Sequence, residues 1–313
     1  MKKIIFIVLA VTLILSLGIG IYYLRISGLP IEKVLPEGAA FYINISDIEK
    51  SREEFKSTRL WKNIKDIDIE TLLEKSGLTS EQITRYKKGV SELFSFKAEL
   101  LLNEFFGREL TLAVYPIEQI LVGPEMIQDA VSKIILVSRI KPKAKFIEFC
   151  YRLANKFGRK IQVEYEKYKG YEITIVKLKD NLSLAYTTVG DLLIISLSKK
   201  QISICLDVVT KDKPSFYQDK EYIFTKSKLP SSARTVVYNN LEVFFSNFRR
   251  FVEASFTSQE NIDKQKSEIL RSLDKMTGFK ATGFASIPGK ISKIKAVSIL
   301  ELSKIDPVVA KFY

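Results

Sequence analysis

Acidic side chains are the first residues of this sequence that could carry out chemistry. Asp66, Asp68 and Glu70 stand close together, and two carboxylates held about 5–10 Å apart across a cleft can hydrolyse a glycosidic bond. The three acids lie beside Lys62 and Lys65 in a polar stretch of the chain. That setting favours helix capping and surface solvation over catalysis.

A serine followed by lysines offers a second chemistry. Ser198 precedes Lys199 and Lys200, and a lysine can activate a serine nucleophile without a histidine. Ser198 also starts a predicted helix, where a capping role is common. The chain contains no histidine, which excludes Ser-His-Asp and Cys-His triads and HExxH zinc sites. We therefore predict no catalytic, cofactor-binding or metal-binding residues, and no cofactor.

An apolar run from Ile4 to Leu24 dominates the N-terminal part of the sequence. As a helix it spans roughly 30 Å, the thickness of the hydrocarbon core of a bilayer. Lys2 and Lys3 precede the run, so the positive-inside rule places the N-terminus in the cytoplasm and the body outside. The alternative is a cleaved signal peptide, whose apolar region is shorter, about 7–15 residues. We expect an uncleaved, single-pass signal-anchor in the cell (inner) membrane and a periplasmic or extracellular body.

The charge balance indicates anionic neighbours. The chain has 49 Lys and Arg residues against 36 Asp and Glu residues, a net charge of +13. Such a charge favours an anionic lipid, an acidic envelope polymer or an envelope protein as partner. The lysines are spread along the chain and form no basic stripe with interleaved aromatics, so no nucleic-acid partner is expected. The remaining predicted partner is the lipid bilayer, contacted through Ile4 to Leu24.

Three further features each have two interpretations. Cys150 and Cys205 fall on apolar faces of predicted helices, which indicates buried free thiols or, alternatively, one disulfide. Phenylalanines at helical spacing from Phe244 to Phe251 belong either to the core or to a groove for a lipid or hydrophobic peptide. Asn44-Ile45-Ser46 and Asn181-Leu182-Ser183 match the glycosylation sequon, a pattern that is common by chance.

Alternating apolar and polar residues predict a series of short strands. The predicted strands are 39–46, 109–115, 133–140, 161–167, 172–178, 182–188, 192–197, 233–239, 279–287 and 290–302. Helical patterns follow Ser46-Asp47, Thr79, Pro142, Ser198 and Asn240. A charged stretch that ends at Lys275 is also predicted to be a helix. Short turns between consecutive strands favour antiparallel pairing.

Two similar phrases organise this pattern. Leu35-Pro36 and Leu229-Pro230 each precede a strand and then a helix. We therefore predict an α+β fold in which an N-terminal transmembrane helix is followed by antiparallel sheets packed with helices, in two similar halves. The predicted divisions are a cytoplasmic tip and anchor at 1–28, a first half at 29–228 and a second half at 229–313.

The order of several turn-and-strand phrases resembles a bacterial domain-of-unknown-function family, number 3352. The phrases cover roughly residues 35–300 and are Leu35-Pro36-Glu37-Gly38-Ala39-Ala40, Phe106-Gly107-Arg108-Glu109-Leu110, Gly170-Tyr171-Glu172-Ile173, the run from Leu184 to Ser196, and Leu229-Pro230 ahead of Tyr238-Asn239-Asn240. The resemblance implies a membrane-anchored envelope protein of unassigned activity. It supplies no catalytic residues.

These observations favour a non-catalytic role. We expect an extracytoplasmic module that binds or organises a partner in the cell envelope. One alternative is a carboxylate-dependent hydrolase of envelope polymer, which requires two acids converging in a cleft, one with a raised pKa. The other is a structural spacer, which would have neither a groove nor a binding patch.

Overall fold

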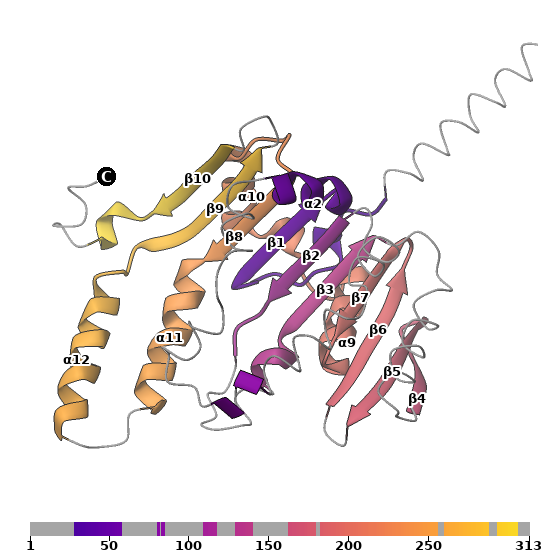
Figure 1. The fold of residues 1–313 in the computed structure, drawn as a ribbon, viewed down its shortest axis with the longest axis horizontal. Helices are drawn as coiled ribbons and strands as arrows, with labels where there is room; N and C mark the ends of the chain where they lie inside the picture. Colours follow the sequence, from indigo (N-terminus) through magenta and orange to yellow (C-terminus); the bar gives the residue numbers. More distant parts are fainter. Residues whose placement is uncertain are drawn as a thin grey trace, which may run out of the picture.

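A computed structural model of the chain describes residues 28–57, 80–81, 83–84, 109–117, 129–139, 162–179, 182–255, 260–287 and 293–305. Figure 1 shows their arrangement. The predicted transmembrane segment, Ile4 to Leu24, lies outside these residues. Within the described part of the chain, no helix is both long and apolar enough to cross a membrane.

The described strands form one antiparallel sheet of ten strands, in the order β10-β9-β8-β1-β2-β3-β7-β6-β5-β4. Alternation of apolar and polar residues along these segments places one side of each strand toward a core. The strands are β1 (Phe41–Ser46), β2 (Glu109–Val114), β3 (Ile134–Arg139), β4 (Gln162–Tyr168), β5 (Tyr171–Lys179), β6 (Leu182–Val189), β7 (Leu192–Ser196), β8 (Thr235–Asn240), β9 (Phe279–Ile287) and β10 (Lys293–Leu300).

The single sheet corrects the predicted fold. We expected an N-terminal transmembrane helix and separate sheets in two similar halves, but β8 pairs directly with β1, with Tyr42 opposite Tyr238. The sheet therefore continues across the predicted boundary at residue 228. The physical reason is that alternation defines the faces of a strand but not its neighbours, and these two strands are almost two hundred residues apart.

Two described helices lie against one face of this sheet, behind it in Figure 1. α9 (Lys199–Val209) packs on β5, β6 and β7, and α10 (Lys220–Lys228) packs on β8, β9 and β10. Two short 3₁₀ helices, η1 (Ile31–Lys33) and η2 (Phe216–Gln218), pack against the same face of the sheet. α11 (Leu241–Ser255) begins directly after the C-terminal end of β8, and α12 (Glu260–Asp274) lies beside it. The remaining described helices are α2 (Ile48–Ser57) and η3 (Leu302–Lys304).

The core lies between the sheet and these covering elements. Tyr42 and Tyr238 supply its largest fully buried side chains from the sheet, and Phe216 supplies one from η2. Ile202 and Leu206 of α9 belong to the same buried cluster. Their spacing of four residues puts both side chains on one face of the helix.

Strand register places one set of polar residues at a common end of the sheet. Ser46 of β1 lies opposite Glu109 of β2, which lies opposite Arg139 of β3. Arg139 in turn lies opposite Leu192 of β7, one residue after Asp191. The chain that follows the predicted anchor joins the body at this end.

Candidate functional site

The segment from Gly28 to Glu37 is built into the body rather than attached to it loosely, and we call it the stem. Ile31, Val34 and Leu35 are buried. The Tyr115 hydroxyl donates a hydrogen bond to the Pro36 carbonyl at 2.8 Å. Backbone hydrogen bonds also join Phe216 to the Leu35 carbonyl and Glu37 to the Pro214 carbonyl. The stem is therefore a part of the core.

A charged row at the end of the sheet fixes the start of the stem. The Arg139 guanidinium donates to Asp191 at 2.6 Å, to Glu109 at 3.2 Å and to the Leu29 carbonyl at 3.0 Å. Burial opposes the charge of Arg139, but its bonds to Asp191 and Glu109 raise its pKa overall. A Cβ at Gly28 would lie 1.9 Å from a guanidinium nitrogen of Arg139, so a side chain there would have to displace the guanidinium from its present position.

A groove lies between α10 and strands β1 and β8, and we call it the aromatic groove. Its cavity volume is about 650 Å³. The walls are mostly apolar and aromatic, with a few polar groups from the stem, β1 and α10. The lining residues are Glu32, Tyr42, Asn44, Ser46, Tyr217, Tyr222, Ile223, Lys226, Ser227, Leu229, Pro230, Ser231, Ala233 and Val236.

Glu32 is the acidic centre of the aromatic groove. The Tyr222 hydroxyl donates to Glu32 Oε1 at 2.8 Å, and the Lys226 ammonium contacts the same oxygen at 2.5 Å. Burial alone would raise the pKa of Glu32, but the charge and hydrogen bond of Lys226 lower it overall. Glu32 is therefore an ionised acceptor and a poor general acid at neutral pH.

Four stacked and edge-on rings form the floor beneath this groove. Ring centroids lie 4.9 Å apart for Tyr42 and Phe216, 4.1 Å for Phe216 and Tyr222, and 5.4 Å for Tyr222 and Tyr238. Gly283 of β9 allows α10 to approach the sheet, because a Cβ there would lie 2.3 Å from the Thr225 methyl carbon. Close packing of α10 thus depends on a missing side chain.

A second groove lies beside the start of the stem, and we call it the basic groove. Its volume is about 710 Å³, and its lining includes Leu29, Lys33, Lys211, Lys213 and Tyr217. The Lys33 ammonium stands over the Tyr217 ring, 5.0 Å from its centroid. Tyr217 also lines the aromatic groove, so the two grooves share one wall.

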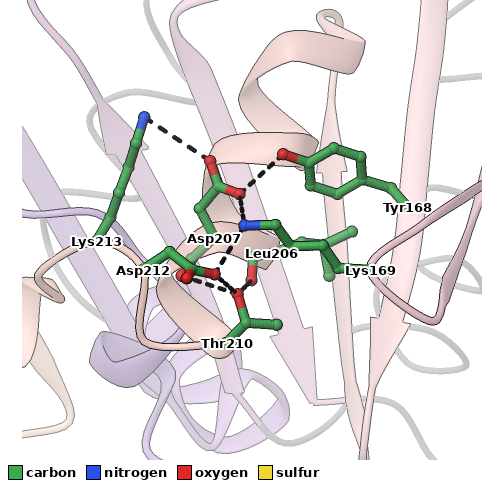
Figure 2. Close-up of polar contacts among 7 residues, drawn as sticks. All are labelled: Tyr168, Lys169, Leu206, Asp207, Thr210, Asp212 and Lys213. Carbon is green, nitrogen blue, oxygen red and sulfur yellow. Dashed lines mark hydrogen bonds and ion pairs between the residues drawn. The ribbon is translucent and has the colours of Figure 1, made fainter.

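An ion-pair cluster adjoins the basic groove, because two of its members, Asp212 and Lys213, line that groove. Figure 2 shows the cluster. Lys169, in the β4–β5 turn, contacts Asp207 at 2.5 Å and Asp212 at 2.7 Å. The Tyr168 hydroxyl donates to Asp207 at 2.9 Å, and the Thr210 hydroxyl donates to Asp212. Hydrogen bonds to the two carboxylates raise the pKa of Lys169, and its bonds lower the pKa of Asp207 and Asp212. All three stay charged, so the cluster joins a hairpin to α9 and supplies no nucleophile.

The candidate acids from the sequence, Asp66, Asp68 and Glu70, lie outside the described residues. Asp219 is a described carboxylate whose pKa is raised by burial. It caps α10 by accepting from the Tyr222 backbone N–H at 2.9 Å. It does not line the aromatic groove. Asp207 and Asp212 do converge on Lys169, but the pKa of each is lowered, so neither is the acid with a raised pKa that the hydrolase alternative requires.

Ser198 lies directly before α9 in the structure. Ser198 holds the N-cap position of α9, as predicted, although its side chain makes no capping hydrogen bond. The neighbouring Lys199 ammonium pairs with Glu166 at 2.5 Å. The predicted cap of α2 is Ser46 or Asp47, and the Asp47 carboxylate accepts from the Lys50 N–H at 3.3 Å.

The predicted phenylalanine stripe of α11 is largely exposed in the structure. Phe244, Phe248 and Phe251 are 54%, 40% and 37% exposed, whereas Val252 of the same helix is buried. The interpretation of this stripe as core is therefore wrong for these three phenylalanines. They stack along α11, with centroids 6.3 Å apart for Phe244 and Phe248.

The cysteines and sequons have mixed outcomes. Cys205 is a fully buried free thiol, and its burial raises its pKa. Cys150 and Asn181 lie outside the described residues. The Asn44 side chain donates to Glu109 at 3.0 Å and to Thr111 at 2.8 Å, so it is occupied within the sheet. No cluster of potential metal ligands occurs in the ranges that the structure describes.

Sequence reasoning missed the residues that build both grooves. Glu32 and Lys226 are 194 residues apart in the chain, so no local pattern links them. A local signal for α10 did exist, because Ser215 and Gln218 form a capping box and Asp219 caps the helix that follows. That signal predicts a helix but not the groove beside it.

Comparison with known proteins identifies a family. Residues 78–280 match the family described as "Protein of unknown function (DUF3352)", as the turn-and-strand phrases predicted. No curated protein matches the chain. Crystal forms I and III of TP0453 are similar solved structures, each with a TM-score of 0.40 and 9% identity, covering 91% and 90% of this chain and 84% of that chain. Because the family match spans more than half of the 313 residues, the chain belongs to the DUF3352 family.

Proposed function

We propose that this chain is a membrane-held, extracytoplasmic binding module of the cell envelope, without catalytic activity. The apolar segment Ile4 to Leu24 holds it in the membrane, and Lys2 and Lys3 keep the N-terminus in the cytoplasm. The folded body then stands on the periplasmic or extracellular side. Its partner is an anionic lipid, an envelope polymer or an envelope protein.

The observation that carries the proposal is the aromatic groove. Its volume of about 650 Å³ lies within the range of roughly 300–1,000 Å³ that is usual for ligand sites. A spacer would need no such groove. Its walls combine aromatic and aliphatic surface with the Glu32–Lys226 pair, a combination that fits an amphipathic ligand with an apolar part and a polar head.

The charge states in the groove favour binding over catalysis. The lowered pKa of Glu32 keeps its carboxylate ionised, and burial raises the pKa of Tyr42 and of Tyr222. Neither tyrosine therefore loses its proton near neutral pH. The groove offers hydroxyl and amide groups, one ionised carboxylate and one ammonium group, which orient a ligand but do not exchange protons with it.

A pair of matched substitutions tests this groove. Ser231 lines it, whereas the adjacent Ser232 does not, and both are exposed. The full chain is extracted in mild detergent, and co-purifying small molecules are identified by mass spectrometry. Ser231→Trp should remove a bound amphipathic ligand that the native chain and Ser232→Trp retain. Equal retention by both variants would exclude the aromatic groove as the site.

A separate experiment tests the location. External protease is added to intact spheroplasts that contain the full chain. Digestion of the body from outside is expected. Protection of the body would place it in the cytoplasm and would contradict the proposal.

A further inference from the structure

We infer that the basic groove binds the phosphate-bearing headgroup of an anionic phospholipid in the membrane that holds the chain. This inference rests on the proposed attachment through Ile4 to Leu24. It adds a second site, distinct from the aromatic groove, with its own ligand chemistry. Three observations carry it: the position of the groove, its charge and its shape.

The position follows from the stem. Only Arg25, Ile26, Ser27 and Gly28 separate Leu24 from Leu29. At about 3.6 Å per residue this connection spans at most about 18 Å. Leu29 lines the basic groove, and its carbonyl is held by Arg139 at 3.0 Å. A body fixed so close to its anchor keeps this groove near the headgroup layer, which is roughly 6 Å thick on each side of the bilayer core.

The charge of the basic groove is positive. Lys33, Lys211 and Lys213 line it and are exposed. Asp212 is the single acid in the lining, and Lys169 already neutralises it at 2.7 Å. Lys33 and Lys211 have no carboxylate partner among the described residues, and Lys213 lies 3.8 Å from Asp207. Lys169 and Lys213 together balance Asp207 and Asp212, so the net positive charge of the groove comes from Lys33 and Lys211.

The shape favours a lipid over a free anion. The lysines stand beside apolar side chains, because Leu29, Val208 and Val209 also line the groove. Tyr217 adds an exposed ring of the type that is enriched at membrane interfaces. A free phosphate would use only the ammonium groups, whereas a phospholipid can place its phosphate on the lysines and its glycerol and first acyl carbons on the apolar wall.

The test measures binding of short-chain lipid monomers to the full chain in mild detergent by native mass spectrometry. The probes are dihexanoyl phosphatidylglycerol, dihexanoyl phosphatidylcholine and glycerol phosphate. The variant is Lys33→Ala/Lys211→Ala/Lys213→Ala. The control, Lys275→Ala/Lys293→Ala/Lys295→Ala, removes the same charge from exposed lysines outside the groove.

Phosphatidylglycerol should bind the native chain and the control variant with similar affinity. At about fivefold for each of the two lysines without a carboxylate partner, the groove variant should bind roughly 25-fold more weakly. Unchanged binding by the groove variant would overturn the inference, and so would equal losses in both variants. Glycerol phosphate binding as tightly as phosphatidylglycerol would identify a free-anion site instead of a lipid site.

Membrane attachment is measured separately, by carbonate extraction of membranes that contain the native chain. Suppose that the chain stays in the pellet and that the groove variant binds phosphatidylglycerol as tightly as the native chain. This inference would then be refuted, and the proposed function would stand. A chain that washes off the membrane would refute the proposed attachment, whatever the lipid titration gives.

Discussion

Two tyrosines under the aromatic groove provide a matched test of the structure. Tyr222 and Tyr238 are both buried, and their rings contact each other. They differ in the hydrogen bonds that their hydroxyl groups make. The Tyr222 hydroxyl donates to the Glu32 carboxylate at 2.8 Å, whereas the Tyr238 hydroxyl makes no hydrogen bond of normal geometry within the part of the chain that the structure describes and interacts only weakly with the Asn240 side chain. Phenylalanine at either position removes one oxygen and keeps the ring.

The expected effects on stability have opposite signs. A hydrogen bond to a charged group contributes about 1.5–3 kcal/mol, so Tyr222→Phe should lower the free energy of unfolding by about 2 kcal/mol. Lys226 continues to neutralise Glu32 in that variant, which limits the loss. Removing a buried hydroxyl that lacks a hydrogen bond of normal geometry recovers part of its desolvation cost, so Tyr238→Phe should raise the free energy of unfolding by about 1 kcal/mol.

Thermal unfolding of the full chain in detergent measures both changes. At about 2–4 °C per kcal/mol for a body of this size, Tyr222→Phe should lower Tm by roughly 4–8 °C, and Tyr238→Phe should raise it by roughly 2–4 °C. The reasoning is refuted if Tyr238→Phe loses as much stability as Tyr222→Phe. That result would mean that the Tyr238 hydroxyl has a partner of similar strength.

Three further predictions concern the stem and α10. The pKa of Glu32 is lowered from 4.5, so its ionised form stabilises the fold above pH 4.5 and this contribution is lost as pH falls through the folded-state pKa. Glu32→Gln should therefore flatten the acid side of the stability profile measured by urea unfolding at several pH values; an unchanged slope would contradict the pairing with Lys226. Gly283→Ala should cost about 1–3 kcal/mol in the same assay by pushing Thr225 and α10 off the sheet, whereas a neutral result would mean that α10 shifts freely. A chain shortened to begin at Gly38 should fail to unfold cooperatively, because it lacks the buried Ile31, Val34 and Leu35; a sharp transition from that chain would show that the stem is dispensable.

Local elements of this fold could be predicted from the sequence, because their signals lie within a few residues. Alternation located β1 and β2 to within about two residues of their observed bounds. The short gap between the predicted strands 161–167 and 172–178 corresponds to the β4–β5 turn, where Lys169 and Gly170 both have positive φ. The four strands from β4 to β7 pair with their sequence neighbours, which is the arrangement that short turns favour.

Strand partners and groove residues could not be predicted, because they depend on contacts between distant segments. The two Leu-Pro phrases correctly precede β1 and β8, and each of these strands is followed by a helix. The pattern does not reveal that β1 and β8 are hydrogen-bonded neighbours, so that the two predicted halves share one sheet. Phe244 shows the same limit, because helical spacing identifies a stripe but not whether another element covers it.

The stem explains why both grooves occur where they do. Glu32 and Lys33 are consecutive residues of η1, yet Glu32 lines the aromatic groove and Lys33 lines the basic groove. The short 3₁₀ turn directs the two charges to opposite sides of Tyr217, the wall that both grooves share. Burial of Ile31, Val34 and Leu35 contributes roughly 5–9 kcal/mol at about 1.5–3 kcal/mol per side chain, comparable with the whole net stability of a domain. Because the core holds these residues so strongly, the segment that leaves the proposed membrane anchor also positions one charged residue in each groove.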